Sequence, residues 1–386
     1  MNAQNRIKAY IVCAAVVLWA FLANAATLPP DPDNAALLYY QAFLLRPEPD
    51  AASAEMIYNV LYGYEPDEKI RDYLEDCNET LKLAEAASKI PECNWGIRYS
   101  QGFGASLPQF EHVRSLSFLL EVHARTLAAD GDYQAALGQC LTLRQFAKHV
   151  GDDTLIAHLV SLAVDGAAQR CIQDVLGSMP LDADVITWLQ GQLSVVQGAS
   201  ESPARAFAMD FELILQTLRI DHDTLTWLRN KYENHESLTD EDIIALAEEP
   251  YADFLNSILR VMDSEMPYEE KYAELQRLEN ELKEEFGNDP AANLIIIVCS
   301  HKVLTTFSIH VRHTAAFNAL KAALEIYLIA AQTGQLPETL PSYLPKDPYS
   351  SQDFEYELTS EGFILRCRVK DNYEDEIQQY EFKVQK

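Results

Sequence analysis

The sequence is poor in basic residues and in glycine. Its 386 residues include 30 Lys and Arg against 59 Asp and Glu, which gives a formal net charge of −29. Binding to nucleic acid or to anionic lipid requires clustered Lys and Arg, so this balance argues against both as partners. Only 14 glycines are present. A large β domain with many tight turns is therefore not expected.

The signatures of several enzyme classes are also missing from the sequence. It contains no H-E-x-x-H zinc motif, no G-x-S-x-G nucleophile elbow and no G-x-G-x-x-G phosphate-binding loop. His235 and Glu236 lack the second histidine of a zinc helix, and Gly102–Gly104 is a lone G-x-G. The sequence therefore assigns no catalytic residue, metal ligand or cofactor. The absence of these motifs favours a protein that is not an enzyme, but it does not exclude an enzyme.

The first 25 residues have the layout of a secretory signal. Arg6 and Lys8 supply a positive start, Ala9–Leu22 is an apolar run, and Ala23–Ala25 offers an A-x-A cleavage site. The apolar run is short for a membrane span. We therefore expect an exported protein, periplasmic or extracellular, with no membrane span once residues 1–25 are removed. The alternative is that the N-terminal segment stays uncleaved and anchors the protein.

Six cysteines follow the signal: Cys77, Cys93, Cys140, Cys171, Cys299 and Cys367. In an oxidising compartment an even number permits pairing. Cys77 and Cys93 flank the end of an expected helix and the turn after it, and they are the predicted disulfide. If residues 132–149 and 153–176 form a hairpin, Cys171 lies too far along its helix to bridge Cys140. The alternative is that all six are buried free thiols.

Apolar residues at i, i+3, i+4 and i+7 predict helix over nearly all of Asn34–Gln332. We expect a mainly α fold, with a multi-helical body of helical hairpins over residues 26–289. Asp289 and Pro290 form a cap followed by a first-turn proline, which opens a long C-terminal helix that ends near Thr333. Residues 290–386 are therefore expected to form a separate part, with this helix at its start.

The tail after Gly334 has the pattern of a loop followed by strands. Each proline in Leu336–Pro345 removes a backbone donor and disfavours helix before it, although the leucines there are spaced as in a helix. Alternating residues predict strands over 353–358 and 363–369, with a further strand over 380–384. We expect Gly362 to form the turn, and the apolar face of the hairpin to pack on the long helix around Tyr327.

Two groups of residues carry resemblances to known families. The first group comprises Pro91-x-Cys93-x-Trp95, Gly131–Tyr133, Thr154–Val160 and, near the N-terminus, Asp33–Ala42. With these, Ile90–Leu176 resembles exported helical proteins of planctomycete-type bacteria, a group with no established activity. The resemblance implies export and a helical body, and it carries over no site.

The second resemblance lies in the tail. Gly334-x-Leu336-Pro337, Leu344–Pro348 and Phe354-x-Tyr356 resemble the head of a type II secretion pseudopilin, which implies a helix, a proline-rich loop and a small antiparallel sheet. A prepilin cleavage site and the family's calcium loop are missing, and the acidic stretch Asp371–Glu376 does not have its spacing. The likeness therefore concerns a structural module, not a pilus subunit.

Histidines and one loop are the remaining candidate sites. His310 and His313 are three residues apart on one expected helix and could reach one metal, while His301 faces another side. We favour a structural role for them. The loop 93–104 brings together four residues suited to stacking a sugar or gripping a peptide: Trp95, Arg98, Tyr99 and Phe103. The alternative is that Trp95 fills the space between helices.

These observations favour a non-enzymatic, exported structural or protein-interaction module that binds a protein or another cell-envelope component. The alternative is an envelope hydrolase or a carbohydrate-binding protein that uses a cleft near the Trp95 loop. A cleft with two or more buried, hydrogen-bonded titratable groups would favour this alternative.

The signal layout predicts the N-terminus of the mature protein. Cleavage after Ala25 leaves Ala26 as the first residue. N-terminal mass spectrometry of the protein exported by its native host checks this expectation. An intact Met1 in the membrane fraction would instead identify an uncleaved anchor.

Overall fold

The computed structural model describes residues 31–151, 154–196, 198–199, 202–232, 237–291, 293 and 302–385. The predicted signal and its cleavage site, together with Cys299, His301 and His235, lie outside these residues. Met1–Asp33 and Asn34–Lys386 are separate units. The architecture below is that of the second unit.

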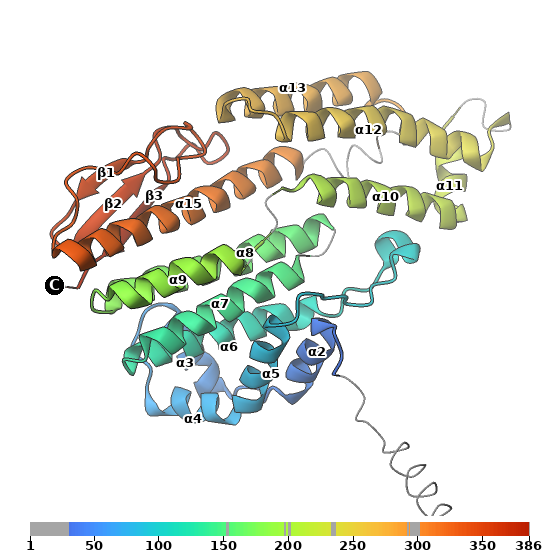
Figure 1. Ribbon diagram of the computed structural model, residues 1–386. Helices are drawn as coiled ribbons and strands as arrows, with labels where there is room; N and C mark the ends of the chain where they lie inside the picture. Colours follow the sequence, from blue (N-terminus) through green and yellow to red (C-terminus); the bar gives the residue numbers. More distant parts are fainter. Residues whose placement is uncertain are drawn as a thin grey trace, which may run out of the picture. The chain divides into compact units, whose positions relative to one another are not determined.

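The second unit is mainly helical, as the sequence predicts, and Figure 1 shows its elements. The N-terminal half contains α2 (Ala35–Leu45), α3 (Ala51–Leu61), α4 (Glu68–Asp76), α5 (Asn78–Ser88), the 3-10 helix η1 (Tyr99–Gly104), α6 (Phe110–Ala129), α7 (Tyr133–Val150) and α8 (Leu155–Ser178). After these come α9 (Ala183–Val195), α10 (Ala204–Ile220), α11 (His222–Arg229), α12 (Asp240–Met262), α13 (Tyr268–Phe286) and α15 (Val303–Thr333).

Many acidic residues of this chain serve as helix caps. An N-cap side chain accepts a hydrogen bond from a backbone N–H that has no partner within the helix. Thr239 and Asp242 form a reciprocal capping box at the start of α12. The other N-caps with such a bond are Asn34, Asp50, Asp67, Asp132, Thr154, Asp182 and Asp221. Part of the excess negative charge is thereby explained by helix starts.

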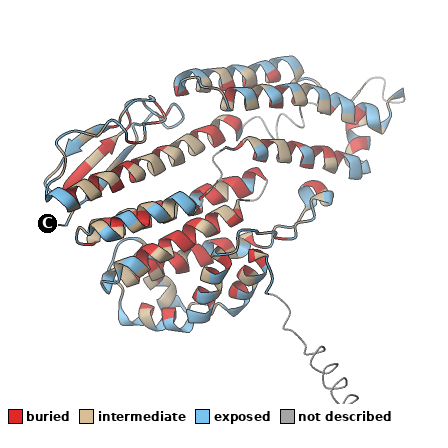
Figure 2. Ribbon diagram, viewed as in Figure 1, coloured by how far each residue is buried: buried red, intermediate tan, exposed pale blue. Residues whose placement is uncertain are grey.

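Two hydrophobic clusters form the interior, and α7 and α8 contribute to both. One cluster contains residues of α2–α8, among them Tyr39, Trp95 and Phe146. The other joins α7–α15 with the tail and includes Cys140 and Ile172. Figure 2 shows buried residues concentrated on α6, α7 and α8. The α7–α8 hairpin therefore contributes buried residues to both clusters and packs against each of them.

The long helix α15 is apolar around its whole circumference because it is packed on several sides. It contacts α8, α9, α13 and β3, and none of its residues from Val303 to Ala331 is exposed. By length and composition α8 and α15 could each cross a membrane, but 61% and 50% of their most apolar stretches are buried inside the unit. Such burial is typical of core helices. The boundary suggested near residue 289 thus does not separate two packed bodies.

The tail forms the antiparallel sheet that the sequence predicts. Strands β1 (Glu355–Leu358), β2 (Gly362–Arg366) and β3 (Gln379–Lys383) lie in the order β1-β2-β3. Phe363 pairs with Phe382 in the register of β2 and β3. Both rings contact Tyr327 of α15, at centroid distances of 5.6 and 6.4 Å. The Tyr327 hydroxyl also donates to the Lys383 carbonyl at 2.6 Å. The expected packing of the sheet on α15 is confirmed.

Gly362 has a different role from the one expected. Its φ is not positive, so the turn before β2 does not require glycine for conformational freedom. A Cβ atom at this position would instead lie 2.0 Å from the Phe382 carbonyl oxygen of β3. Glycine is needed because the two strands approach closely here.

Cys77 and Cys93, the predicted disulfide pair, are both free thiols in this structure. Cys77 caps the start of α5 and hydrogen-bonds with Tyr73. Cys93 lies beyond the other end of α5, which spans about 16 Å at 1.5 Å per residue. There it lies near Tyr39, whose pKa is raised by burial and further by the Cys93 thiol. The two sulfurs therefore have different surroundings.

The expected stagger of the α7–α8 hairpin is also wrong. The Ser161 hydroxyl donates to the Ala147 carbonyl at 2.7 Å, and Arg144 pairs with Asp165. These two contacts place position 140 opposite positions 168–169 of α8 and not opposite position 162. Cys171 lies two to three residues further along α8, about 4 Å from that level, and is therefore not excluded as a neighbour of Cys140.

Packing of the sheet on α15 predicts the cost of a core substitution in the tail. Phe363 is 0% exposed, so Phe363→Ser should destabilise the protein by about 3–5 kcal/mol through lost burial and the cavity that remains. Urea unfolding measures this change. Leu358→Ser is the control, because Leu358 lies in the same sheet and is 47% exposed. Equal effects of the two substitutions would contradict the described packing.

Candidate functional site

Trp95 is a core residue in this structure and not part of an open loop. Its side chain is 6% exposed and stacks on Phe43 at a centroid distance of 6.1 Å. Its indole N–H donates to the His149 carbonyl at 2.7 Å, which ties it to α7. Tyr39 stacks on it at 5.7 Å. The alternative interpretation, that Trp95 fills the space between helices, describes these contacts.

The rest of the predicted loop lies against α10. The Phe103 N–H donates to the Thr217 hydroxyl at 2.9 Å, and a Cβ atom at Gly102 would lie 2.2 Å from that same oxygen. Gly102 also has a φ of +58°, so glycine is required at this contact. Arg98 and Phe103 are exposed and Tyr99 is half-buried. Because Trp95 is buried, the four residues do not share one exposed surface.

The two histidines on α15 also have separate partners. The ring of His310 stacks against His158 of α8 at 5.8 Å. His313 Nε2 lies 2.7 Å from Asp165 Oδ2. Among the residues that the structure describes, no group of three or more His, Cys, Asp and Glu is placed to hold a metal ion. His310 and His313 therefore have different neighbours, and His301 lies outside the described residues.

The His313 contact belongs to a buried charged group that we name the Asp165 cluster, formed by Arg144, Asp165, Gln169 and His313. Arg144 Nη1 donates to both Asp165 oxygens, at 2.9 and 3.0 Å. Gln169 Nε2 donates to Oδ2 at 3.1 Å. The members come from α7, α8 and α15, so a single carboxylate joins three helices.

Packing closes the Asp165 cluster on all its described sides. The side chains of Asp165 and Arg144 are 0% and 5% exposed, and that of His313 is 12% exposed. The Arg144 guanidinium lies 3.9 Å from the centre of the Phe317 ring. A Cβ atom at Gly198 would lie 2.6 Å from the Asp165 oxygens, so the loop after α9 covers the pair directly. The described residues around Asp165 therefore enclose its carboxylate.

Burial sets the protonation of the groups around the cluster. Burial lowers the pKa of the Arg144 guanidinium, and the neighbouring Asp165 carboxylate acts in the opposite direction. Burial, and to a smaller extent nearby His313, lowers the pKa of His158 to about 4. His158 is therefore neutral at neutral pH. The Asp165 oxygens already accept bonds from several donors, so the carboxylate is suited to fixing helices and poorly suited to abstracting a proton.

A second buried carboxylate, Asp371, contacts Arg312, the residue of α15 that precedes His313. Arg312 Nη2 donates to its Oδ2 at 2.9 Å. The hydroxyls of Tyr268 and Tyr349 donate to its two oxygens at 3.3 and 3.2 Å. Burial raises the pKa of Tyr268 to about 12, so its hydroxyl stays protonated. We name these four residues the Asp371 cluster; it joins α13, α15 and the tail.

Sequence interpretation missed most members of both clusters. Asp165 interrupts an apolar stretch of α8, and Arg144 is likewise a charged residue on a mostly buried helix. A charge inside an apolar helical pattern is a signal for a buried partner. The sequence identifies Asp371 only as the first residue of the acidic stretch Asp371–Glu376. None of these signals identifies the partner, which comes from another element.

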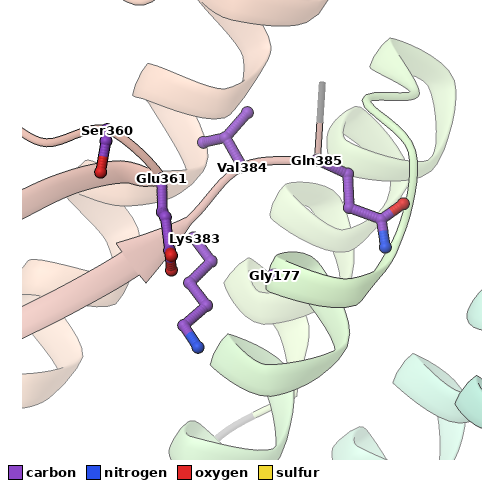
Figure 3. Close-up of a pocket in the computed structure, with 6 residues that line it drawn as sticks. All are labelled: Gly177, Ser360, Glu361, Lys383, Val384 and Gln385. Atoms are coloured by element: carbon purple, nitrogen blue, oxygen red, sulfur yellow. The ribbon is translucent and has the colours of Figure 1, made fainter.

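Two shallow hollows in the described part of the chain lie away from both clusters. One shallow hollow of about 280 Å³ lies where the end of α8 meets the tail, and Figure 3 shows its lining. Its lining residues are Gly177, Ser360, Glu361, Lys383, Val384 and Gln385. Another, of about 410 Å³, lies along α13 and is lined by residues of that helix alone. Neither hollow contains a hydrogen-bonded set of buried titratable groups.

Comparison with known proteins adds no relative. No protein-family model matches the chain, and no curated protein or solved structure matches it either. The two resemblances described from the sequence therefore stay predictions.

Enclosure of the Asp165 cluster predicts a large effect of neutralising its carboxylate. Asp165→Asn keeps the shape of the side chain but leaves Arg144 buried without a counter-charge. We expect the free energy of unfolding to fall by about 3–5 kcal/mol. Urea unfolding at neutral pH measures it.

The control for this substitution is Glu357→Gln. Glu357 pairs with Arg366 on the sheet, and their side chains are 55% and 34% exposed. Removing such an exposed pair should change the free energy by about 1 kcal/mol or less. An Asp165→Asn protein as stable as this control would show that the cluster does not hold the helices together.

Proposed function

We propose that the protein is an exported, non-enzymatic interaction module of the cell envelope that binds a basic segment of another protein. Export is supported by the charged start, the apolar run and the A-x-A sequence at the N-terminus. A protein partner, and not nucleic acid, is supported by the net charge of −29.

The observation that carries this proposal is a set of exposed tyrosines on and after α3, which we name the α3 tyrosine patch. Tyr58, Tyr62 and Tyr64 are 44%, 81% and 68% exposed. Tyr58 and Tyr62 are four residues apart and lie on one face of the helix. Tyr58 also contacts Phe118 of α6 at a centroid distance of 5.9 Å, which fixes one end of the patch.

Exposed tyrosines of this kind are suited to binding a protein. Tyrosine offers a large apolar ring with few rotatable bonds and a hydroxyl that can hydrogen-bond, and it is enriched at protein interfaces. Acidic side chains surround the patch in the sequence, and Glu55, Glu65, Asp67 and Glu68 are all exposed. Complementary charge therefore favours a basic partner.

The alternative function has less support from the packing. A hydrolase or carbohydrate-binding protein using the Trp95 loop needs a cleft beneath Trp95, and that space holds Tyr39 and Phe43. The Asp165 and Asp371 clusters contain buried titratable groups that hydrogen-bond to one another, and beneath Trp95 the Tyr39 hydroxyl also lies 3.0 Å from His149 Nδ1. Tyr39 and His149 are both buried, so this pair does not face an open cleft. The exposed side chains of Arg98 and Phe103 remain available for a contact, but they do not line a cavity with Trp95.

The resemblances give the proposal its context. Export and a helical body agree with the likeness to planctomycete-type exported proteins. The pseudopilin-like tail is proposed to act as a packing module, because its apolar face is used against Tyr327 of α15. The partner is then bound elsewhere, at the α3 tyrosine patch.

Site-specific photo-crosslinking tests the proposal in cells of the native host. A photoreactive residue replaces Tyr62 in the full chain, and irradiation should give a covalent adduct with a basic envelope protein. The matched control places the same residue at Tyr343, which is 69% exposed and lies in the proline-rich loop. We expect no adduct at that position.

Charge dependence makes the test specific. Glu55→Gln combined with Glu65→Gln should reduce the yield of the Tyr62 adduct several-fold, because the complementary charge is lost. Adducts of equal yield at Tyr62 and Tyr343, or no adduct at either, would contradict the proposed surface. Binding of cell-wall oligosaccharides that is lost on Phe103→Ala would favour the alternative function.

A further inference from the structure

Two cysteines face each other across the α7–α8 hairpin. The register of the two helices is fixed by the bonds from Ser161 to Ala147 and from Arg144 to Asp165. Cys140 lies one turn before Arg144, and Cys171 lies nearly two turns after Asp165. Because the helices are antiparallel, these steps lead in the same direction along the hairpin. The two steps differ by two residues, so they bring the two cysteines to within about 3 Å of the same level along the helices.

The two side chains are close neighbours. Both residues are 0% exposed and belong to the same hydrophobic cluster. Burial raises the pKa of Cys140, and the neighbouring Cys171 thiol raises it further. Both are free thiols in the structure. Neighbouring cysteines on two packed helices can form a disulfide bond after a small approach of the two sulfurs.

We propose that Cys140 and Cys171 form an inter-helix disulfide when the chain folds in an oxidising compartment. This inference relies on the proposed function only for export, which supplies the compartment. It reverses the sequence-based stagger argument, which placed the two residues too far apart.

The oxidation is a thiol–disulfide exchange with a disulfide-bearing oxidant such as oxidised glutathione or a disulfide carrier protein. One thiolate attacks the oxidant and forms a mixed disulfide, releasing one thiolate of the oxidant. The second cysteine then attacks the mixed disulfide, forms the Cys140–Cys171 bond and releases the other thiolate. The two protons of the cysteines end on the two released thiols, so two electrons pass from the protein to the oxidant.

Because both sulfurs are buried in the folded protein, we expect the exchange to occur during folding. A hairpin of two adjacent helices brings the cysteines together locally, closing a loop of about thirty residues. The exchange can then occur before neighbouring helices cover the sulfurs. Arg125 lies near this pair and lowers the pKa of Cys140 against the effect of burial. A nearby guanidinium of this kind favours the attacking thiolate.

The other described cysteines are not placed in this way. Cys77 hydrogen-bonds with Tyr73, Cys93 lies near Tyr39, and the thiol of Cys367 hydrogen-bonds with Asp347.

Refolding of the purified full chain in glutathione buffer tests the proposal without any need for export. The protein is unfolded with denaturant and reductant, refolded with reduced and oxidised glutathione, acid-quenched, alkylated and digested. Mass spectrometry should show the peptides of Cys140 and Cys171 linked, with the loss of two thiol hydrogens. The oxidised protein should unfold several degrees above the reduced protein.

Cysteine variants give the matched controls. Cys171→Ser should abolish both the linked peptide and the difference in unfolding temperature between oxidised and reduced protein. Cys367→Ser should leave the linked peptide in place. Refolded wild-type protein in which Cys140 and Cys171 are both alkylated, or in which either is linked to another cysteine, would overturn the proposal. Neither result bears on the photo-crosslinking at Tyr62, so the two proposals fail separately.

Discussion

The position of α15 depends on two buried carboxylates that hold consecutive residues of one helix. Arg312 pairs with Asp371 of the tail, and His313 contacts Asp165 of α8. Consecutive helical residues point about 100° apart, so both contacts form together only at one rotation of α15. A buried carboxylate that loses its partner costs several kcal/mol. This requirement selects one arrangement of an otherwise uniformly apolar helix, and the sheet packs against the surface that it sets.

Local patterns in the sequence predict much of the fold. Thr239 and Asp242 announce a capping box, and Gly334, with a φ of +78°, ends α15. Prolines stop the leucines after Gly334 from continuing the helix, and alternation in residues 353–369 predicts the strands. Each of these features is decided by residues within a few positions of one another. The sequence alone therefore supports the fold class, most helix ends and the position of the tail.

The site residues depend instead on contacts between distant parts of the chain. The register of the α7–α8 hairpin differs from the expected one by nearly two turns, which changes the relation of Cys140 to Cys171. The contacts of Ser161 with Ala147 and of Arg144 with Asp165 set this register, and they join residues far apart in the sequence. Trp95 looked suitable for a ligand because its neighbours in sequence are glycine and aromatic residues. Its partners in space, Tyr39 and Phe43, come from α2, and nothing local to Trp95 identifies them. Asp165 likewise has its charged partners, Arg144 and His313, on other helices, and no residue near it in the sequence identifies them.

The use of basic residues connects the interior to the proposed function. The chain has 30 Lys and Arg for 59 acidic residues. Some of these basic residues pair with buried acidic residues. Arg144 and Arg312 neutralise buried carboxylates, and Arg125 pairs with Glu121 and Asp174 with 16% of its side chain exposed. Each of these pairs removes an acidic residue together with the cation, so the acidic surplus of the chain remains. Glu55, Glu65, Asp67 and Glu68 are exposed around the α3 tyrosine patch, and a basic partner is the complement that we propose for this charge.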